Sequence, residues 1–322
     1  MSGRQHRELS LIVGGGGFVG RHLLAELLRQ PDNDVHVTKL PHETATTDAI
    51  WHDLDVCDAN AVTDLIQQIG PTSIFHLAAQ SSVARSWTSP DLTIDVNVKG
   101  SLHVLDAAHS LARTPRVLLV GSSDEYGTTA QQQSVLAEDS PTRPMNPYAM
   151  TKVAQNSLGT IYAKAFDLPV VMVRAFNHIG PGQPEGFVVS DFCRQVALIE
   201  AKLQPPILQV GNLNARRDFS DVRDIVRAYS ALIQTGKPGV TYNVGSGKSL
   251  AISELLDLIL SCSTVKISVQ VDESKLRPID ISDSCADTTR ITSDCGWQPV
   301  IPLKQSVLET LNWWRQRITD SG

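Results

Sequence analysis

The segment LIVGGGGFVGRHLL, which runs from Leu11 to Leu24, places five glycines within seven residues. An apolar run at 9–13 precedes the glycines and predicts a strand, and leucines at helical spacing follow them and predict a helix. A glycine turn between a strand and a helix lets the backbone approach a pyrophosphate, which the helix N-terminus attracts. We therefore expect a dinucleotide to contact Gly14, Gly17, Phe18, Val19 and Gly20. Gly15 and Gly16 are interpreted as loop filler.

Strand and helix patterns continue to alternate after this segment, which predicts an α/β protein with a doubly wound parallel sheet of the Rossmann type. From about Phe176 the alternation fails and turn-rich segments such as NHIGPGQPEG appear. We expect a nucleotide-binding domain over residues 1–175 and a smaller, interleaved substrate-binding region over 176–322. The predicted strands lie at 9–13, 34–39, 73–78, 116–121 and 170–176.

Composition excludes several other classes of protein. Hydrophobic residues make up 42% and charged residues 19% of the chain, and no apolar run reaches the roughly 18 residues of a membrane span. The N-terminus does not read as a signal peptide, so a cytoplasmic enzyme is expected. Five cysteines without a C-x-x-C pair indicate reduced thiols and no metal site. A net charge of −6 argues against a nucleic-acid partner.

The end of the second predicted strand is where a cofactor ribose is usually read, about 20 residues after the glycines. An NAD-binding protein usually offers a carboxylate there, but this chain has Lys39 and no acidic residue before Glu43. A lysine favours a 2′-phosphate, so the sequence predicts NADP(H). The alternative is that Lys39 is only solvated and contacts no phosphate.

The segment NPYAMTK contains Tyr148 and Lys152, an i, i+4 pair on one face of a predicted helix. A nearby ammonium favours the phenolate, so we expect Lys152 to lower the pKa of Tyr148. The segment VGSSDEYG follows the fourth predicted strand and places the Ser122 hydroxyl at the carboxyl edge of the sheet. These three residues predict a catalytic group that polarises a carbonyl and transfers a proton to it. A surface tyrosine beside a solvated lysine is the alternative.

At these residues the chain resembles the extended short-chain dehydrogenase/reductase family, in its nucleotide-sugar branch. The resemblance covers almost the whole length, through the glycine loop, DLDV at 53–56, HLAA at 76–79, NVKG at 97–100, the serine loop, Y-x-x-x-K and RDFSDVRD at 217–224. It implies Ser122, Tyr148 and Lys152 as the catalytic triad. Val13 departs from the family, which usually has threonine there. The family resemblance also implies a set of cofactor contacts: Asp55, Val56, Leu77, Ala78, Ala79, Asn97, Tyr148 and Lys152.

Within that branch, the segments at 174–183, 210–229 and 276–278 are most similar to reductases that act on a GDP-linked 4-keto-6-deoxy sugar. The resemblance implies NADPH-dependent reduction of the C4 ketone. Arginine side chains hold diphosphate oxygens with two parallel hydrogen bonds, which Arg217 and Arg277 are expected to do. A surface ion pair of Arg217 with Asp221 is the alternative. The remaining predicted substrate contacts are Ser123, Asp124 and Asn177, and guanine rests on the resemblance alone.

Sugar-nucleotide 4,6-dehydratases are the main alternative, because they share the fold, the cofactor and the triad. These dehydratases carry Thr-x-Glu at the position of the serine loop, and the glutamate removes the C5 proton of the sugar. Aligned without a gap, this chain has Asp124 there, and a carboxylate retracted by about 1 Å disfavours elimination. A one-residue shift would place Glu125 there and Ser123 in the triad. Other sugar-nucleotide epimerases or dehydratases and a non-enzymatic NADP-sensing module stay open.

Two predicted helical segments, at 91–112 and 147–166, carry small and apolar residues on more than one face. A helix that is apolar around much of its circumference needs two buried sides. Related enzymes pair these helices across a dimer, so a homodimer is expected. The residues in question are Ala107, Ala108, Ala149, Ala154 and Leu158.

Overall fold

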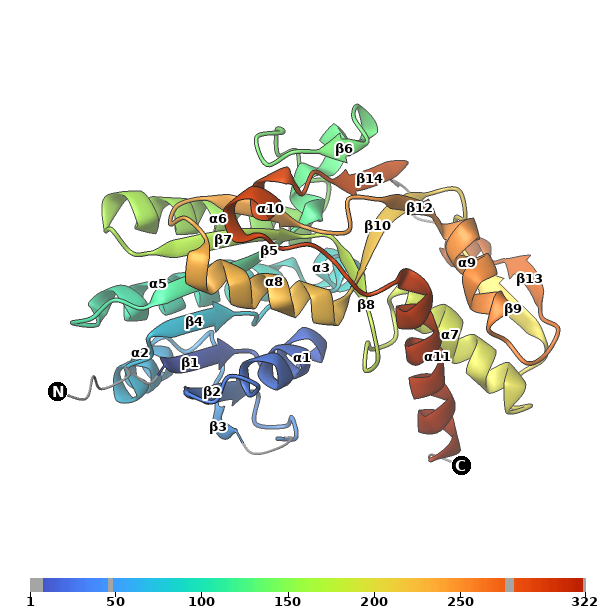
Figure 1. Ribbon diagram of the computed structural model, residues 1–322, viewed down its shortest axis with the longest axis horizontal. Helices are drawn as coiled ribbons and strands as arrows, with labels where there is room; N and C mark the ends of the chain where they lie inside the picture. The colour runs from blue at the N-terminus through green and yellow to red at the C-terminus, as the bar shows by residue number, and fades with distance from the viewer. Residues whose placement is uncertain (1–7, 46–48, 276–280, 321–322) are drawn as a thin grey trace.

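A seven-stranded parallel sheet forms the centre of the computed structural model, which describes residues 8–45, 49–275 and 281–320. The strand order is β11-β7-β5-β4-β1-β2-β3, and every neighbouring pair is parallel, so the predicted doubly wound sheet is confirmed (Figure 1). The strands are β1 (Glu8–Val13), β2 (Asn33–Lys39), β3 (Ile50–Asp53), β4 (Ser73–His76), β5 (Arg116–Ser122), β7 (Val170–Ala175) and β11 (Thr241–Val244).

The two outer strands were not predicted. β3 is a four-residue strand of mixed polar and apolar character, IWHD, which gives little periodic signal. β11 comes from the part of the chain after residue 176 and pairs with β7, so this part of the chain also builds the nucleotide-binding sheet. The division at residue 175 stays a prediction.

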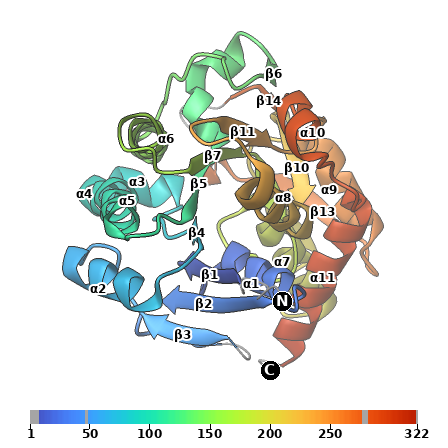
Figure 2. The same cartoon turned by 60° about the vertical axis from the view of Figure 1, so that its left-hand side comes forward.

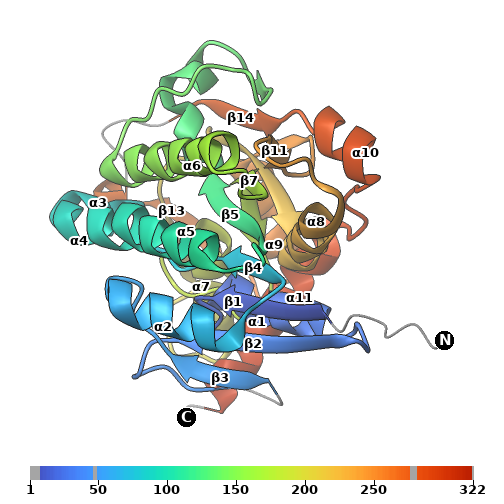
Figure 3. The same cartoon turned by 90° about the vertical axis from the view of Figure 1, so that its left-hand side faces the viewer.

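Helices cover both faces of the sheet (Figures 2 and 3). One face packs against α1 (Phe18–Leu27) and α8 (Val222–Thr235) around a core that includes Leu24, Val173 and Tyr229. The other packs against α2 (Ala59–Ile69), α5 (Gly100–Ser110) and α6 (Pro147–Ala165). Short elements join this second layer: α3 (Val83–Thr88), α4 (Pro90–Ile94), the π-helical turn η1 (Asp95–Lys99) and the 3₁₀ segment η2 (Ser123–Gln131).

The helix α6 shows how local sequence fixes the position of a functional residue. Asn146 is its N-cap and accepts a hydrogen bond from the Ala149 backbone N–H at 2.8 Å. Pro147 occupies the first helical position, where its missing N–H costs nothing. The helix therefore begins immediately before Tyr148 and turns Lys152 toward the sheet.

Helices and short strands, nearly all of them after β7 in the chain, form a second region beside the carboxyl ends of the main sheet (Figure 1). Its core packs α7 (Val188–Glu200), α9 (Ile252–Ser261) and α11 (Leu303–Thr319) together. Its small sheets contain β6 (Val135–Leu136), β8 (Asn177–Ile179), β9 (Ile207–Val210), β10 (Arg216–Asp221), β12 (Ser249–Ala251), β13 (Ser268–Val271) and β14 (Asp283–Ala286), and it also contains the short helix η3 (Glu273–Lys275). The helix α10 (Thr289–Cys295) packs instead against α8 and the edge strand β11 of the main sheet.

Three of the alanines on α5 and α6 are buried within the chain itself. Ala107 and Ala108 belong to the core between the sheet and its helices, and Ala149 is 0% exposed. Ala154 and Leu158 are only half-buried on α6. The homodimer stays a prediction.

No helix among the described residues is both long and apolar enough to cross a membrane.

Candidate active site

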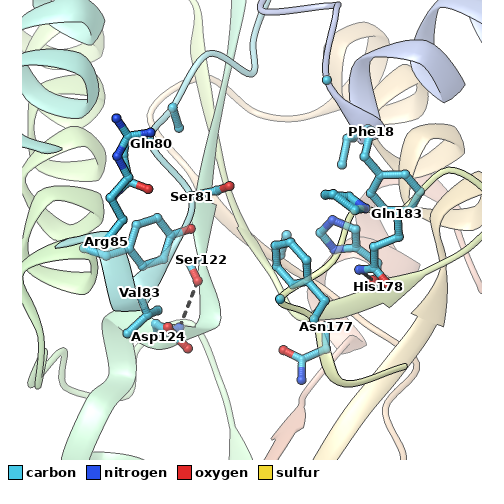
Figure 4. Close-up of a pocket in the computed structure, with 18 of the residues that line it drawn as sticks. Phe18, Gln80, Ser81, Val83, Arg85, Ser122, Asp124, Asn177, His178 and Gln183 are labelled. Atoms are coloured by element: carbon cyan, nitrogen blue, oxygen red, sulfur yellow. Dashed lines mark hydrogen bonds between the residues drawn. The ribbon is translucent and has the colours of Figure 1, made fainter. Parts of the chain in front are cut away.

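A cavity of about 1770 Å³ lies between the carboxyl ends of the main strands and the second region (Figure 4). That volume exceeds the upper end of typical single-ligand pockets, near 1,000 Å³, and suits two ligands. The residues predicted for the site from distant parts of the chain come together in its wall. These are Gly14, Gly17, Phe18, Val19, Gly20, Lys39, Asp55, Val56, Leu77, Ala78, Ala79, Ser122, Ser123, Asp124, Tyr148, Lys152, Asn177 and Arg217.

The glycine loop has the geometry that a pyrophosphate needs. Gly14 has φ +88°, and a Cβ there would lie 2.6 Å from the backbone of Ala78. A Cβ on Gly20 would lie 2.5 Å from Gly15 Cα. At Gly17, the N-cap of α1, the nearest atom to an added Cβ is 3.9 Å away. The loop is therefore tight against the protein and open toward the cavity, which fits a dinucleotide phosphate held by backbone N–H groups.

Gly15 is not loop filler, contrary to the sequence interpretation. A Cβ on Gly15 would lie 2.1 Å from Val37 Cγ1, so the loop can pack on β2 only with glycine there. Gly16 faces the Glu43 carboxylate, whose Oε2 would lie 2.4 Å from an added Cβ. The Glu43 side chain is flexible and can move aside, so only Gly15 has a packing requirement that glycine spacing alone does not reveal.

The ribose end of the cavity carries both signs of charge. Lys39 Nζ lies 2.5 Å from Asp53 Oδ1 at the end of the neighbouring strand β3. Glu43 also lines this end and accepts a hydrogen bond from the Leu40 N–H at 2.9 Å. Lys39 is thus ion-paired rather than simply solvated. The carboxylate that pairs with it comes from a strand that sequence patterns had not predicted.

Asn97 lies behind the cavity wall rather than in it. It is fully buried in η1, and its amide holds the Gln80 backbone in two hydrogen bonds, of 2.8 and 3.1 Å. It also donates to Thr151 Oγ1 on α6 at 2.9 Å. π-helical turns are often found at functional sites. This one joins the loop after β4 to the helix that carries Tyr148, so Asn97 is a positioning residue here.

Ser122, Tyr148 and Lys152 meet at the end of β5. The Ser122 hydroxyl caps η2 by accepting a hydrogen bond from the Asp124 N–H at 3.1 Å, drawn in Figure 4. Lys152 is buried, and its Nζ donates to Val120 O at 2.8 Å and to Gln155 Oε1 at 2.9 Å. Nζ lies 5.9 Å from the centroid of the Tyr148 ring.

The protonation of Tyr148 differs from the expectation. Burial raises the pKa of Tyr148 above its usual value, the Asp124 carboxylate raises it further, and a hydrogen bond with Ser122 opposes both. Burial also lowers the pKa of Lys152 to about 8. The neutral phenol is therefore the stable form, which suits a proton donor, and the expected pKa-lowering by Lys152 is absent in this structure.

The serine loop contains two adjacent carboxylates, Asp124 and Glu125, which lie in different surroundings. Glu125 is completely buried, and its carboxylate accepts from the Ser122 N–H at 3.0 Å and from Arg174 Nε at 2.9 Å. Asn156 Nδ2 also lies 3.3 Å from it. Asp124 lines the cavity beside Ser122, whereas Glu125 does not. The alignment shift that would make Glu125 a base is therefore unsupported by its position.

The predicted substrate side lies across the cavity. Asn177 lies on β8 and Arg217 on β10, and both line the wall. Arg217 Nη1 donates to Ile281 O at 2.6 Å. Asp221, the alternative partner of Arg217, is instead paired with Arg223 at 2.8 Å. Arg277 lies outside the described residues.

Several cavity residues were missed by sequence reasoning. Figure 4 shows Gln80, Ser81, Val83 and Arg85 on the Ser122 side, and His178 and Gln183 with Phe18 on the opposite side. His178 stacks on Phe18 with ring centroids 6.1 Å apart. The signal was available, because both groups follow strands that end at this edge of the sheet. Among the described residues, no group of three or more His, Cys, Asp or Glu side chains could hold a metal ion.

Comparisons with known proteins agree with this geometry. The family model described as GDP-mannose 4,6 dehydratase matches residues 11–310. The chain is similar to GDP-6-deoxy-D-mannose reductase of Pseudomonas aeruginosa, with 31% identity over 96% of this chain and 98% of that protein. It is 30% identical to GDP-mannose 4,6 dehydratase 2 of Arabidopsis thaliana over 94% of this chain and 85% of that one. A solved structure of RMD from Pseudomonas aeruginosa complexed with NADPH has a TM-score of 0.86 and 31% identity, covering 96% of this chain and 99% of that one.

Proposed function

This chain belongs to the GDP-mannose 4,6 dehydratase family of extended short-chain dehydrogenase/reductases, and on that premise we propose that it is the reductase rather than the dehydratase. Its proposed reaction is the NADPH-dependent reduction of the C4 ketone of GDP-4-keto-6-deoxy-D-mannose to GDP-6-deoxy-D-mannose. The proposal rests on the positions of the two carboxylates in the serine loop. The longer one, Glu125, forms a buried ion pair with Arg174, and only the shorter one, Asp124, lines the cavity.

Reduction of the ketone needs a hydride at C4 of the sugar, which a bound NADPH would supply. The chain's own residues supply the other requirements. The neutral Tyr148 hydroxyl gives its proton to the C4 oxygen, so that the C=O bond becomes CH–OH. Ser122 donates a hydrogen bond to the same oxygen and polarises the carbonyl. Lys152 holds the nicotinamide ribose beside Tyr148. An elimination would instead need a base at C5, for which Asp124 is one methylene short.

The dinucleotide is proposed to be NADPH. Lys39 stands at the end of β2, where a 2′-phosphate would lie, and the RMD protein was solved with NADPH. Two carboxylates oppose this preference, because Glu43 lines the same end of the cavity as Lys39 and Asp53 already pairs with Lys39. We propose that Lys39 exchanges Asp53 for the phosphate, whose higher charge makes it the stronger partner.

The sugar nucleotide is proposed to lie between the reactive triad and the second region. Arg217 and Arg277 would hold the diphosphate, Asn177 the sugar phosphate, and Ser123 and Asp124 the hexose. The guanine base is inferred from the named relatives, which act on GDP-sugars. Assembly as a homodimer through α5 and α6 is part of the proposal. Its support is an exposed apolar stripe on α6 that includes Met150 and Ile161.

Cofactor stoichiometry tests the proposed reaction. A reductase consumes one NADPH for each product formed, whereas a dehydratase returns its hydride to the sugar and needs only catalytic cofactor. With GDP-4-keto-6-deoxy-D-mannose, NADPH absorbance should fall in proportion to added substrate. With GDP-mannose and NADP, no keto sugar should form. Efficient conversion of GDP-mannose would overturn the reductase assignment and favour the dehydratase, the second candidate.

The variant Asp124→Glu provides a sharper comparison. It restores the longer carboxylate at the position where dehydratases carry glutamate, so a trace of elimination from GDP-mannose is expected. Asp124→Asn is the matched control, because it keeps the shape of the side chain and removes the base. Equal elimination by both variants would contradict the assignment of this position.

A further inference from the structure

Helix α6 carries a third buried polar side chain on the face that carries Tyr148 and Lys152. Gln155 stands at i+3 from Lys152, as Lys152 stands at i+4 from Tyr148, so the three side chains share one side of the helix. Gln155 is 1% exposed. Lys152 lines the active-site cavity, whereas Gln155 does not. Gln155 therefore reaches the site through Lys152.

Gln155, Lys152 and Val120 form a closed set of three hydrogen bonds. Lys152 Nζ donates to Val120 O at 2.8 Å and to Gln155 Oε1 at 2.9 Å. Gln155 Nε2 donates to the same Val120 oxygen at 3.3 Å. The opposite orientation of the amide would turn its NH₂ group toward the ammonium and its oxygen toward the carbonyl. The set therefore fixes the Gln155 oxygen toward Lys152.

These hydrogen bonds also connect the two halves of the triad. Val120 lies on β5, two residues before Ser122, so the bonds tie α6 to the strand that leads into the serine loop. An ammonium has three N–H groups. Val120 and Gln155 take two of them, and among the described residues the third has no partner. One N–H of Lys152 is thus left for a ligand.

The other ionisable groups around Lys152 do not replace Gln155. Glu125, on η2, attracts the ammonium through space, but its carboxylate is paired with Arg174 at 2.9 Å. Burial raises the pKa of Tyr148, so this phenol is neutral. Burial and the charge of Lys152 lower the pKa of His76 on β4 to about 3, so this ring is neutral too. No carboxylate among the described residues forms an ion pair with Lys152, so its charge depends on two neutral acceptors.

We propose that Gln155 is a positioning residue that holds the Lys152 ammonium in place and keeps it charged, so that one N–H is directed at the cofactor ribose. The inference rests on the proposed function in one respect, the role of Lys152 at the nicotinamide ribose. A hydrogen bond from a charged donor is about twice as strong as one from a neutral donor, so the ammonium binds the ribose better than the amine. Without Gln155, Lys152 keeps only Val120 O and loses its proton at lower pH.

The pH dependence of NADPH binding to the whole protein tests the proposal without turnover. In calorimetric titration, the Kd of the wild-type protein should rise above about pH 8, where Lys152 loses its proton. Gln155→Met keeps the length of the side chain and removes the acceptor, so the rise should begin about one to two pH units lower. Gln155→Glu supplies a charged acceptor, so the rise should move to higher pH.

Gln195→Met is the matched control. Gln195 is also a buried glutamine with two hydrogen bonds, to Gln209 O at 3.1 Å and from Gln209 N at 2.8 Å, but it lies on α7 in the second region. Its loss should lower the Tm and leave the pH dependence of NADPH binding as in the wild type.

Three results would overturn the proposal. These are a Gln155→Met profile that coincides with the wild-type profile, an equal shift by Gln195→Met, and a shift to lower pH by Gln155→Glu. Wild-type protein that binds NADPH but does not reduce the keto sugar would count against the proposed function alone. Wild-type protein that binds NADH instead would count against the proposed cofactor, and the same profiles with NADH would then test Gln155, because both cofactors carry the nicotinamide ribose.

Discussion

Arg174 Nε lies 2.9 Å from Glu125 Oε2, and both side chains are removed from solvent. This ion pair ties the serine loop to the end of β7 and turns the Glu125 carboxylate away from the cavity. Asp124, the preceding residue, lines the cavity. In the proposed function, the orientation of these two adjacent acidic residues favours reduction over elimination.

Protein stability should depend more on the Glu125 carboxylate, which is in this ion pair, than on the Asp124 carboxylate. Arg174→Met leaves Glu125 buried without its partner and should lower the free energy of unfolding by about 3–5 kcal/mol. Asp124→Asn lies on the cavity wall and should change it by less than about 1 kcal/mol. Urea denaturation measures both. Equal losses would show that Glu125 has no greater structural role than Asp124.

Tyr148→Phe should lower kcat severely and leave NADPH binding nearly intact. The variant keeps the ring and removes only the hydroxyl that would protonate the C4 oxygen. Steady-state kinetics and calorimetric titration of NADPH give the two quantities. A variant that kept more than a tenth of the wild-type kcat would contradict the role of Tyr148.

The buried Lys152 predicts the alkaline limb of the pH profile. Its pKa is lowered to about 8 by burial, so the ammonium loses its proton as the pH rises through that value. We expect kcat/KM to fall above about pH 8, because kcat/KM reports groups of the free enzyme.

Gln155→Glu tests this assignment. Gln155 Oε1 lies 2.9 Å from Lys152 Nζ, and a carboxylate there would favour the ammonium and raise the pKa of Lys152. The limb should therefore move to higher pH. A limb that stays in place would assign it to another group.

The Lys39 and Asp53 pair predicts how cofactor choice can be changed. Lys39→Ala should weaken NADPH binding about tenfold and leave NADH binding nearly unchanged, since only NADPH carries the 2′-phosphate. Asp53→Asn should strengthen NADPH binding, because Lys39 no longer has a competing carboxylate. Dissociation constants for both cofactors check the pair. Equal effects on NADPH and NADH would place the phosphate elsewhere.

The proposed dimer can be tested on α6. Ile161 is 53% exposed in the single chain, and Ile161→Glu should convert a dimer to the 35.0 kDa monomer in light scattering. Val300→Glu is the control, since Val300 is 68% exposed and lies away from α5 and α6. Wild-type protein that is already monomeric at micromolar concentration would contradict the dimer.

The sequence by itself determined the nucleotide-binding half of this protein. The glycine loop, five of the seven sheet strands and the spacing of Tyr148 and Lys152 are local patterns, and period-2 and period-3.6 hydrophobicity encodes them directly. The carboxyl edge of a parallel sheet then brings the residues after each strand together, which is why Ser122 and Tyr148 could be placed in one site.

Only the tertiary structure decided the relationships between segments that are far apart in the chain. Arg174 sets the direction of the Glu125 carboxylate, Asp53 forms the ion pair of Lys39, and Val37 leaves no room for a side chain at Gly15. The expected lowering of the Tyr148 pKa by Lys152 was wrong, because burial raises the pKa of this phenol and the spacing of the two residues does not reveal their burial. Whether a buried side chain finds a hydrogen-bond partner is likewise decided only by the fold, since hydrogen-bond satisfaction is a property of the folded environment and not of the chain.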